Sequence, residues 1–164
     1  MLVRSTFATA LALALSLAGA SARAADQACT VSVAGPVKAS FKCKIDFITR
    51  GDGAVRILIT PVKLPKSVKA IIPGELELPS PVQAQVYPFD RLTNAKVILT
   101  TATHATFSAE KTKKDSRGDL KVTLTKVENV APGHDIHPSL SGKMEARLVP
   151  SGGAKGEARV TVTF

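Results

Sequence analysis

The chain has 164 residues, with 22 Lys and Arg against 13 Asp and Glu, two Cys, one Tyr and no Trp. This length suits one domain, and it excludes most multidomain enzymes and any large cofactor-binding architecture. The formal net charge of +9 favours anionic molecules as partners.

Residues 1–24 have the organisation of a secretory signal peptide. Met1–Arg4 is a short basic start, an Ala- and Leu-rich apolar run spans 7–19, and Ala22-Arg23-Ala24 supplies the small residues that precede a cleavage site. We expect cleavage before Ala25 and export to the periplasm or the extracellular space; the alternative is an N-terminal anchor. No segment reaches the roughly 20 apolar residues of a membrane-spanning helix, so we expect no transmembrane segment after processing.

The predicted mature chain, residues 25–164, has the composition of one all-β domain. Loss of Arg4 and Arg23 leaves 20 basic side chains against 13 acidic ones, a net charge of +7 over 140 residues. This part of the chain holds 15 Val and 13 Thr, and such β-branched residues favour strands over helices. A chain of this length can bury a full core without a metal or several disulfides.

The first two predicted strands form a hairpin closed by a disulfide. Apolar residues alternate with polar ones along 29–33 and 37–47, and Gly35-Pro36 lies between them as a turn. A chain that folds back about this turn places Cys29 opposite Cys43 on the buried face, within bonding reach. Export exposes the pair to an oxidising environment. We therefore predict a structural Cys29–Cys43 disulfide, with two buried free thiols as the alternative.

The remaining strands are short and separated by Gly and Pro. Alternation predicts inward-facing residues at Val68, Ala70 and Ile72, and again at Val82, Ala84 and Val86. Residues 88–94 are irregular, with room for one helical turn. The C-terminal half is typical of paired hairpins, with strands near 95–103, 105–111, 120–124, 140–148 and 158–164.

This spacing predicts an antiparallel β-sandwich of about eight to ten short strands. The alternative is a small β-barrel. Internal prolines such as Pro61, Pro73 and Pro79 favour the sandwich, because they would interrupt the continuous wall of a barrel.

Catalytic motifs are absent from the sequence, which contains no nucleophile elbow, phosphate-binding loop, dinucleotide fingerprint or zinc-protease motif. Glu75 and Glu77 lie two apart on one strand face, as a pair of catalytic carboxylates would, but a solvated strand face has the same pattern. We expect no catalytic residues, no enzyme activity and no cofactor. A hydrolase with a dispersed site is the alternative.

Three histidines are the candidate metal ligands. His134 and His137 lie in one loop between prolines, and His104 lies at a separate junction between strands. Three imidazoles could fill three of the four positions around zinc, and they also suit copper. A periplasmic metal-binding protein is therefore a second functional hypothesis, although a loop enforces no ligand geometry and solvated histidines have the same pattern.

Basic side chains are the candidate binding surface. Lys38, Lys42 and Lys44 share the outward face of one strand, and more lysines follow in the Pro-rich bend at 63–69. Lys113, Lys114 and Arg117 crowd a hairpin tip. The composition does not favour nucleic acid, because Tyr87 is the one aromatic residue expected at the surface for stacking.

The preferred hypothesis is thus a non-enzymatic, bacterial-type envelope or secreted binding or structural module. Its partner would be an anionic envelope polysaccharide or lipid headgroups, and we expect no nucleic acid. The alternative for the charge is solubility and protection of strand edges.

Overall fold

The computed structural model describes residues 27–73, 76–111, 116–130 and 137–164. The predicted signal peptide lies outside these residues. The described chain contains twelve strands and one short 3-10 helix, in the order β1 (Gln27–Ala34), β2 (Ala39–Thr49), β3 (Val55–Pro61), β4 (Val68–Pro73), β5 (Leu76–Leu78), β6 (Val86–Tyr87), η1 (Phe89–Arg91), β7 (Ala95–Thr101), β8 (Thr106–Lys111), β9 (Ser116–Arg117), β10 (Asp119–Glu128), β11 (Ser139–Ser151) and β12 (Ala158–Thr163).

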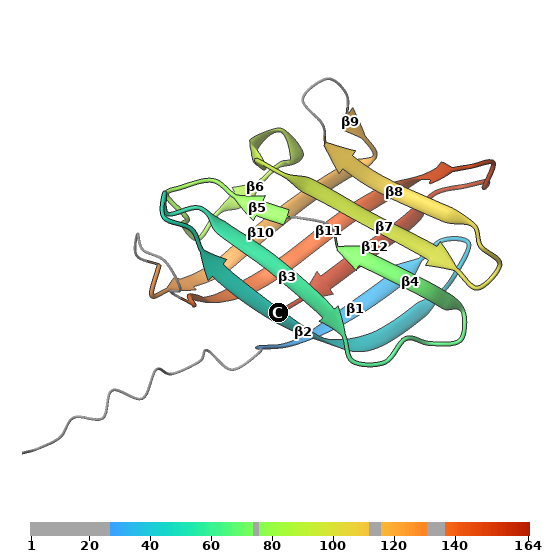
Figure 1. The fold of residues 1–164 in the computed structure, drawn as a ribbon, viewed down its shortest axis with the longest axis horizontal. Coiled ribbons are helices and arrows are strands. Elements are labelled where there is room, and N and C mark those ends of the chain that lie inside the picture. Colours follow the sequence, from blue (N-terminus) through green and yellow to red (C-terminus); the bar gives the residue numbers. More distant parts are fainter. Residues whose placement is uncertain (1–26, 74–75, 112–115, 131–136) are drawn as a thin grey trace, which may run out of the picture.

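The strands form one antiparallel sheet that curls over itself. Its main path runs β4-β7-β8-β11-β12-β1-β2-β3-β5, and β10 pairs with β11 and β6. The long strand β11 causes the fold-over, because one of its edges pairs first with β10 and then, at Val149–Ser151, with β8. As a result, β4 and β7 cross in front of β11, β12 and β1 (Figure 1). The buried hydrophobic side chains of these strands belong to one core cluster.

The predicted all-β, antiparallel fold is confirmed. The strand count exceeds the expected eight to ten because β5, β6 and β9 are only two or three residues long. The one helical turn expected within 88–94 is present as η1.

The first hairpin has the predicted register. Cys29 lies opposite Cys43 in the β1–β2 ladder, their Cα atoms are 4.8 Å apart, and the two sulfurs are bonded. The turn at Gly35-Pro36 sets this register, and the alternation of the strands then places both sulfurs on the buried face. The disulfide prediction is confirmed.

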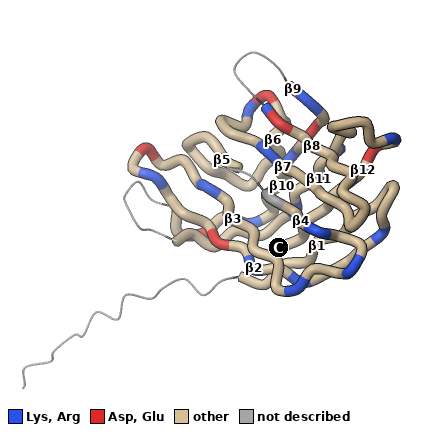
Figure 2. The backbone as a smooth tube through the Cα atoms, turned by 45° about the vertical axis from the view of Figure 1, so that its right-hand side comes forward, with Lys and Arg blue, Asp and Glu red and all other residues tan. Residues whose placement is uncertain are grey.

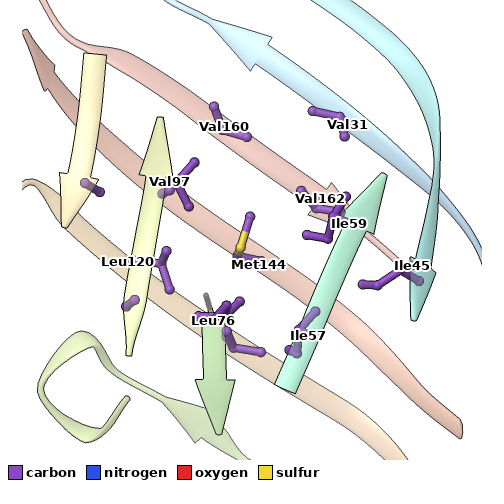
Figure 3. Packing of buried hydrophobic residues seen from close by; sticks show 14 of the residues in the cluster. Val31, Ile45, Ile57, Ile59, Leu76, Val97, Leu120, Met144, Val160 and Val162 are labelled. Atoms are coloured by element: carbon purple, nitrogen blue, oxygen red, sulfur yellow. The ribbon is translucent and has the colours of Figure 1, made fainter. Parts of the chain in front are cut away.

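The core lies between the crossing strands and is aliphatic. Figure 3 shows Ile57 and Ile59 of β3 and Val97 of β7 in the nearer layer, with Met144 of β11 and Val160 and Val162 of β12 in the layer behind them. At the C-terminus, the ring of Phe164 lies 5.5 Å from that of Phe47, so the last residue packs against this core as the alternation of β12 predicts. Burial of these side chains supplies the main driving force for the fold.

Two local predictions are wrong. In β4 the pairing with β7 shifts between Val68 and Ala70, so Ile71, instead of Ala70, joins Val68 in the core. Such a shift inserts one residue and exchanges the two faces of the strand beyond it. The sequence alone gives no turn residue that would mark this position.

The second error concerns residues 82–87. Val82 is buried as expected, but Ala84 is exposed, Val86 is 51% exposed and Tyr87 is buried, the reverse of the expected orientation. Residues 82–85 are not a strand, because the backbone of Gln83 bonds to a side chain: its N–H donates to the Tyr87 hydroxyl, which donates in turn to the Gln83 carbonyl. Tyr87 is therefore a core residue, not a surface aromatic.

Candidate functional site

The disulfide hairpin places two predicted site lysines on the outside of the sheet. Phe41, Cys43 and Ile45 are buried, so the intervening Lys42 and Lys44 point away from the core and are exposed. Lys38 is exposed in the turn that leads into the same strand. The outward orientation expected from the alternation is therefore present.

The tertiary structure adds the β3–β4 connection to this surface. Cys43 pairs with Pro61, and the N–H of Val62 donates to the carbonyl of Lys42 at 3.1 Å. The chain that carries Lys63 and Lys66 therefore starts beside Lys42 (Figure 1). We call the exposed set Lys38, Lys42, Lys44, Lys63, Lys66 and Lys69 the basic margin.

Few anionic groups balance the basic margin. Residues 27–73 contain eight Lys and Arg but only Asp46 and Asp52 as acidic side chains. Asp46 contacts His137, and Asp52 accepts a hydrogen bond from the Ala54 N–H. Figure 2 shows Lys and Arg, without Asp or Glu, along the lower right edge of the molecule. The margin is thus a one-sign surface that favours an anionic partner.

Several lysines of the margin lack carboxylate partners. Among the described residues, Lys38, Lys63 and Lys66 have no side-chain partner, and Lys42 makes only a long contact of 3.5 Å with the Thr30 hydroxyl. Lys69 lies 3.2 Å from ring nitrogen Nδ1 of His104. These ammonium groups are available to a ligand without loss of an internal ion pair.

The structure does not bring the described histidines together. His104 lies in the β7–β8 turn against Lys69, whereas His137 precedes β11 and contacts Asp46 of β2 at 3.1 Å. Figure 1 places that turn and the start of β11 at opposite ends of the molecule. His134 lies outside the described residues. Within the described part of the chain, no three His, Cys, Asp or Glu side chains gather as metal ligands would.

The predicted basic tip is only partly described, because Lys113 and Lys114 fall outside the described residues. Arg117 is exposed on β9, opposite Glu110 of β8. Figure 1 shows β9 at the far side of the molecule from β2, so Arg117 does not belong to the basic margin.

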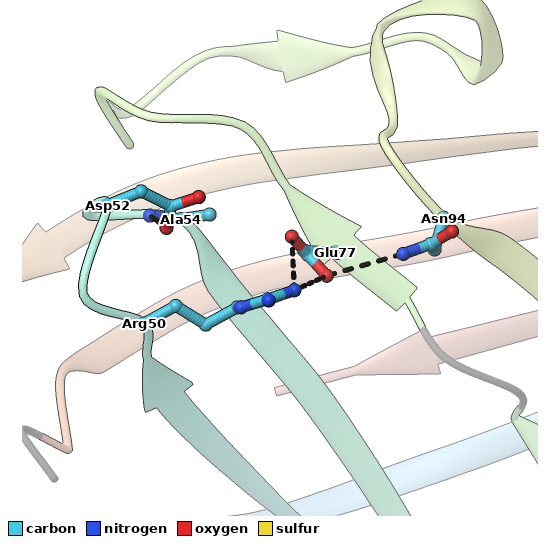
Figure 4. A network of polar contacts seen from close by, with 5 residues as sticks. All are labelled: Arg50, Asp52, Ala54, Glu77 and Asn94. Carbon is cyan, nitrogen blue, oxygen red and sulfur yellow. Dashed lines mark hydrogen bonds and ion pairs between the residues drawn. The ribbon is translucent and has the colours of Figure 1, made fainter. Parts of the chain in front are cut away.

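Glu77 has a structural role that the sequence pattern does not indicate. The pattern predicts a solvated face, but only 2% of Glu77 is exposed, and Glu75 lies outside the described residues. One Arg50 nitrogen donates to both carboxylate oxygens, at 3.1 and 2.9 Å, and Asn94 lies 3.4 Å from one of them (Figure 4). The backbones of Glu77 and Asn94 also pair, so this cluster joins β5 to the chain entering β7.

The outer face of β10–β12 also carries charges, but they neutralise one another. Glu145 lies 3.1 Å from Lys121 and 3.2 Å from Lys143, and Arg147 pairs with Glu157. The ammonium group of Lys121, followed by that of Lys143, lowers the pKa of Glu145 below its ordinary value. A shallow depression there contains Asp119 and Glu145, but Glu145 is engaged by the two lysines instead of facing another carboxylate.

Known proteins provide no further guide to the site. No family model matches the sequence, and comparisons with curated proteins and with solved structures find no similar chain. The one helical element of the described residues is the three-residue η1, so no helix there has the length or apolarity needed to cross a bilayer. Function must therefore be inferred from the surface itself, since an all-β fold hosts many unrelated functions.

Proposed function

We propose that this protein is a non-enzymatic, exported binding module whose basic margin holds an anionic component of the cell envelope. The observation that carries the proposal is the gathering of six exposed lysines beside two aspartates that are engaged elsewhere. The Cys29–Cys43 disulfide and the signal-peptide pattern of residues 1–24 support an oxidising compartment outside the cytoplasm.

The form of the margin favours an extended polyanion or a charged surface over a small anion. Lysine ammonium groups are strongly hydrated point charges on flexible stems, and they attract anionic groups without fixing a geometry. The hollow next to Lys42 is shallow and open, and it is lined partly by Thr30, Thr163 and Phe164. Binding of this kind is weak for each charge, accumulates over several charges and falls as salt rises.

Charge reversal at two positions tests the proposal. Lys42→Glu/Lys63→Glu removes positive charge from the margin, whereas Arg91→Glu/Lys126→Glu makes the same change in net charge elsewhere on the surface. We expect the wild type and the Arg91/Lys126 variant to be retained at low salt by immobilised alginate, by vesicles with anionic headgroups, or by both, and released as salt increases. The Lys42/Lys63 variant should not be retained.

Two outcomes would contradict this function. If both double variants lose retention equally, net charge alone accounts for binding and the margin is not a site. If the wild type is retained by neither anionic material at low salt, the lysines serve solubility. Circular dichroism of each variant confirms that the β fold is intact before its retention is compared.

A further inference from the structure

An exposed aliphatic side chain lies among the lysines of the basic margin. Of the described residues, the large hydrophobic ones that are exposed are Leu58 (39%), Val62 (63%) and Val86 (51%). Val62 is the most exposed of them and lies between Pro61 and Lys63, within the margin. Leu58 lies on the outward face of the preceding strand, β3. Charge and apolar surface therefore occur together here.

The β3–β4 connection holds Val62 outward. The Val62 N–H is bonded to the Lys42 carbonyl, and the Val68 N–H donates to the Pro65 carbonyl at 3.0 Å, which turns the chain back toward β4. Leu64 packs against the core between these two bonds. With Leu64 directed inward and Val62 directed outward, the connection presents a valine flanked by Lys63 and Lys66.

This arrangement distinguishes between the anionic partners. Recognition of a sugar chain commonly uses exposed aromatic rings, but among the described residues Tyr87 and four Phe are buried and Phe164 is half-buried. A bilayer surface, by contrast, accepts an aliphatic side chain below the headgroups while flanking lysines reach the lipid phosphates. Anionic lipid adds the charge complementarity that the margin requires.

We propose that the partner of the basic margin is an anionic lipid bilayer and that residues 62–66 form its membrane-anchoring loop. Val62 enters the interface, and Lys42, Lys63 and Lys66 contact headgroup phosphates. This inference rests on the proposed function and specifies its ligand. Neither the valine nor the lysines would hold the protein on the bilayer alone. One valine buries little apolar surface, and the lysines attract headgroups only through a charge interaction that salt screens.

The test compares two exposed valines on two anionic materials. Val62→Ser removes the proposed anchor, and Val86→Ser makes the same change on β6, outside the margin. Sedimentation is measured with vesicles of equal parts phosphatidylglycerol and phosphatidylcholine, and retention is measured on immobilised alginate. Val62→Ser should weaken vesicle binding about fivefold and leave alginate retention unchanged. Val86→Ser should alter neither.

A fluorescent reporter gives an independent measurement. An environment-sensitive dye attached at Val62→Cys should shift to the blue when the anionic vesicles are added, whereas the same dye at Val86→Cys should not. Pure phosphatidylcholine vesicles should shift the emission of neither labelled variant, because they carry no net negative charge to attract the lysines.

The results separate this inference from the proposed function. Binding to alginate but not to vesicles would make a polysaccharide the partner: the lipid inference would fail and the binding function would stand. The lipid inference would also fail if the wild type binds vesicles but Val62→Ser and Val86→Ser bind them equally well. Failure of the wild type on both materials would overturn the function itself.

Discussion

The two parts of the chain, residues 27–73 and residues 76–164, build strands in the same way but differ in how their charged side chains are paired. Both parts build antiparallel strands with apolar residues inward and polar residues outward. The first contains eight basic and two acidic side chains, and the second contains twelve basic and nine acidic ones. The outward lysines of β2 lie opposite Thr30, Ala28 and Thr60, whereas Lys121 and Lys96 lie directly opposite Glu145 and Glu110.

This difference separates charges that stabilise the fold from charges that are available to a partner. Opposite charges across a ladder give a small stabilisation, and like charges repel. In the second part, Lys96 and Lys121 form such cross-strand pairs with Glu110 and Glu145. The first part leaves most of its lysines without a carboxylate and relies on a covalent cross-link for local stability. Variants in the two parts should therefore differ in their free energy of unfolding.

Loss of the disulfide should have the largest effect. Cys29→Ala/Cys43→Ala opens a loop with a sequence separation of 14, and the chain-entropy model assigns such a loop about 3 kcal/mol. Urea unfolding should show a decrease of that size, with strand content retained in circular dichroism. A decrease below about 1 kcal/mol would mean that β1 and β2 do not depend on the cross-link.

Arg50→Gln should have the next largest effect. It removes the guanidinium from the buried Glu77 carboxylate, and hydrogen bonds to charged groups contribute about 2 kcal/mol. The double variant with Glu77→Gln should lose less than the sum of the two single changes, because no buried carboxylate is left without its arginine. Additive losses would show that Arg50 and Glu77 act independently. Arg91→Gln, on the exposed end of η1, is the control.

Glu145→Gln should have a smaller, pH-dependent effect. The lysines hold the folded-state pKa of Glu145 below its ordinary value, so the ionised carboxylate stabilises the fold above the pKa of the unfolded chain. That contribution disappears as pH falls through the folded-state pKa. Urea unfolding of wild type and variant should therefore differ near neutral pH, by less than about 1 kcal/mol, and converge in acid. A constant difference at all pH values would exclude the ionic contribution.

The smallest effect should come from Lys63→Glu in the basic margin. The side chain is exposed and has no partner among the described residues, so the free energy of unfolding should change by no more than about 0.5 kcal/mol. Reduced repulsion among the lysines favours a slight stabilisation at low salt. The matched change Lys121→Glu should destabilise, because it places two carboxylates opposite each other. If Lys63→Glu and Lys121→Glu change the free energy of unfolding equally, the lysines of the two parts do not differ in their contribution to stability.

The sequence determined the features that depend on neighbouring residues. A turn at Gly35-Pro36 and a period of two along the flanking strands fix the register of β1 and β2, and therefore the disulfide and the outward orientation of Lys42. The same period identifies the inner faces of β7, β11 and β12. These features are predictable because a hairpin brings together residues that are close in the chain.

Features that depend on distant partners arise only when the whole chain packs. Glu77 is buried where Arg50 and Asn94 contact it, between β5 and the start of β7. Tyr87 is buried where β6 pairs with β10, because it lies there opposite Val122. The basic margin likewise forms only when the connection after β3 lies beside β2. Alternation specifies which side chains share a face of one strand. It does not specify which distant segment covers that face, because the covering segment depends on how the whole chain packs.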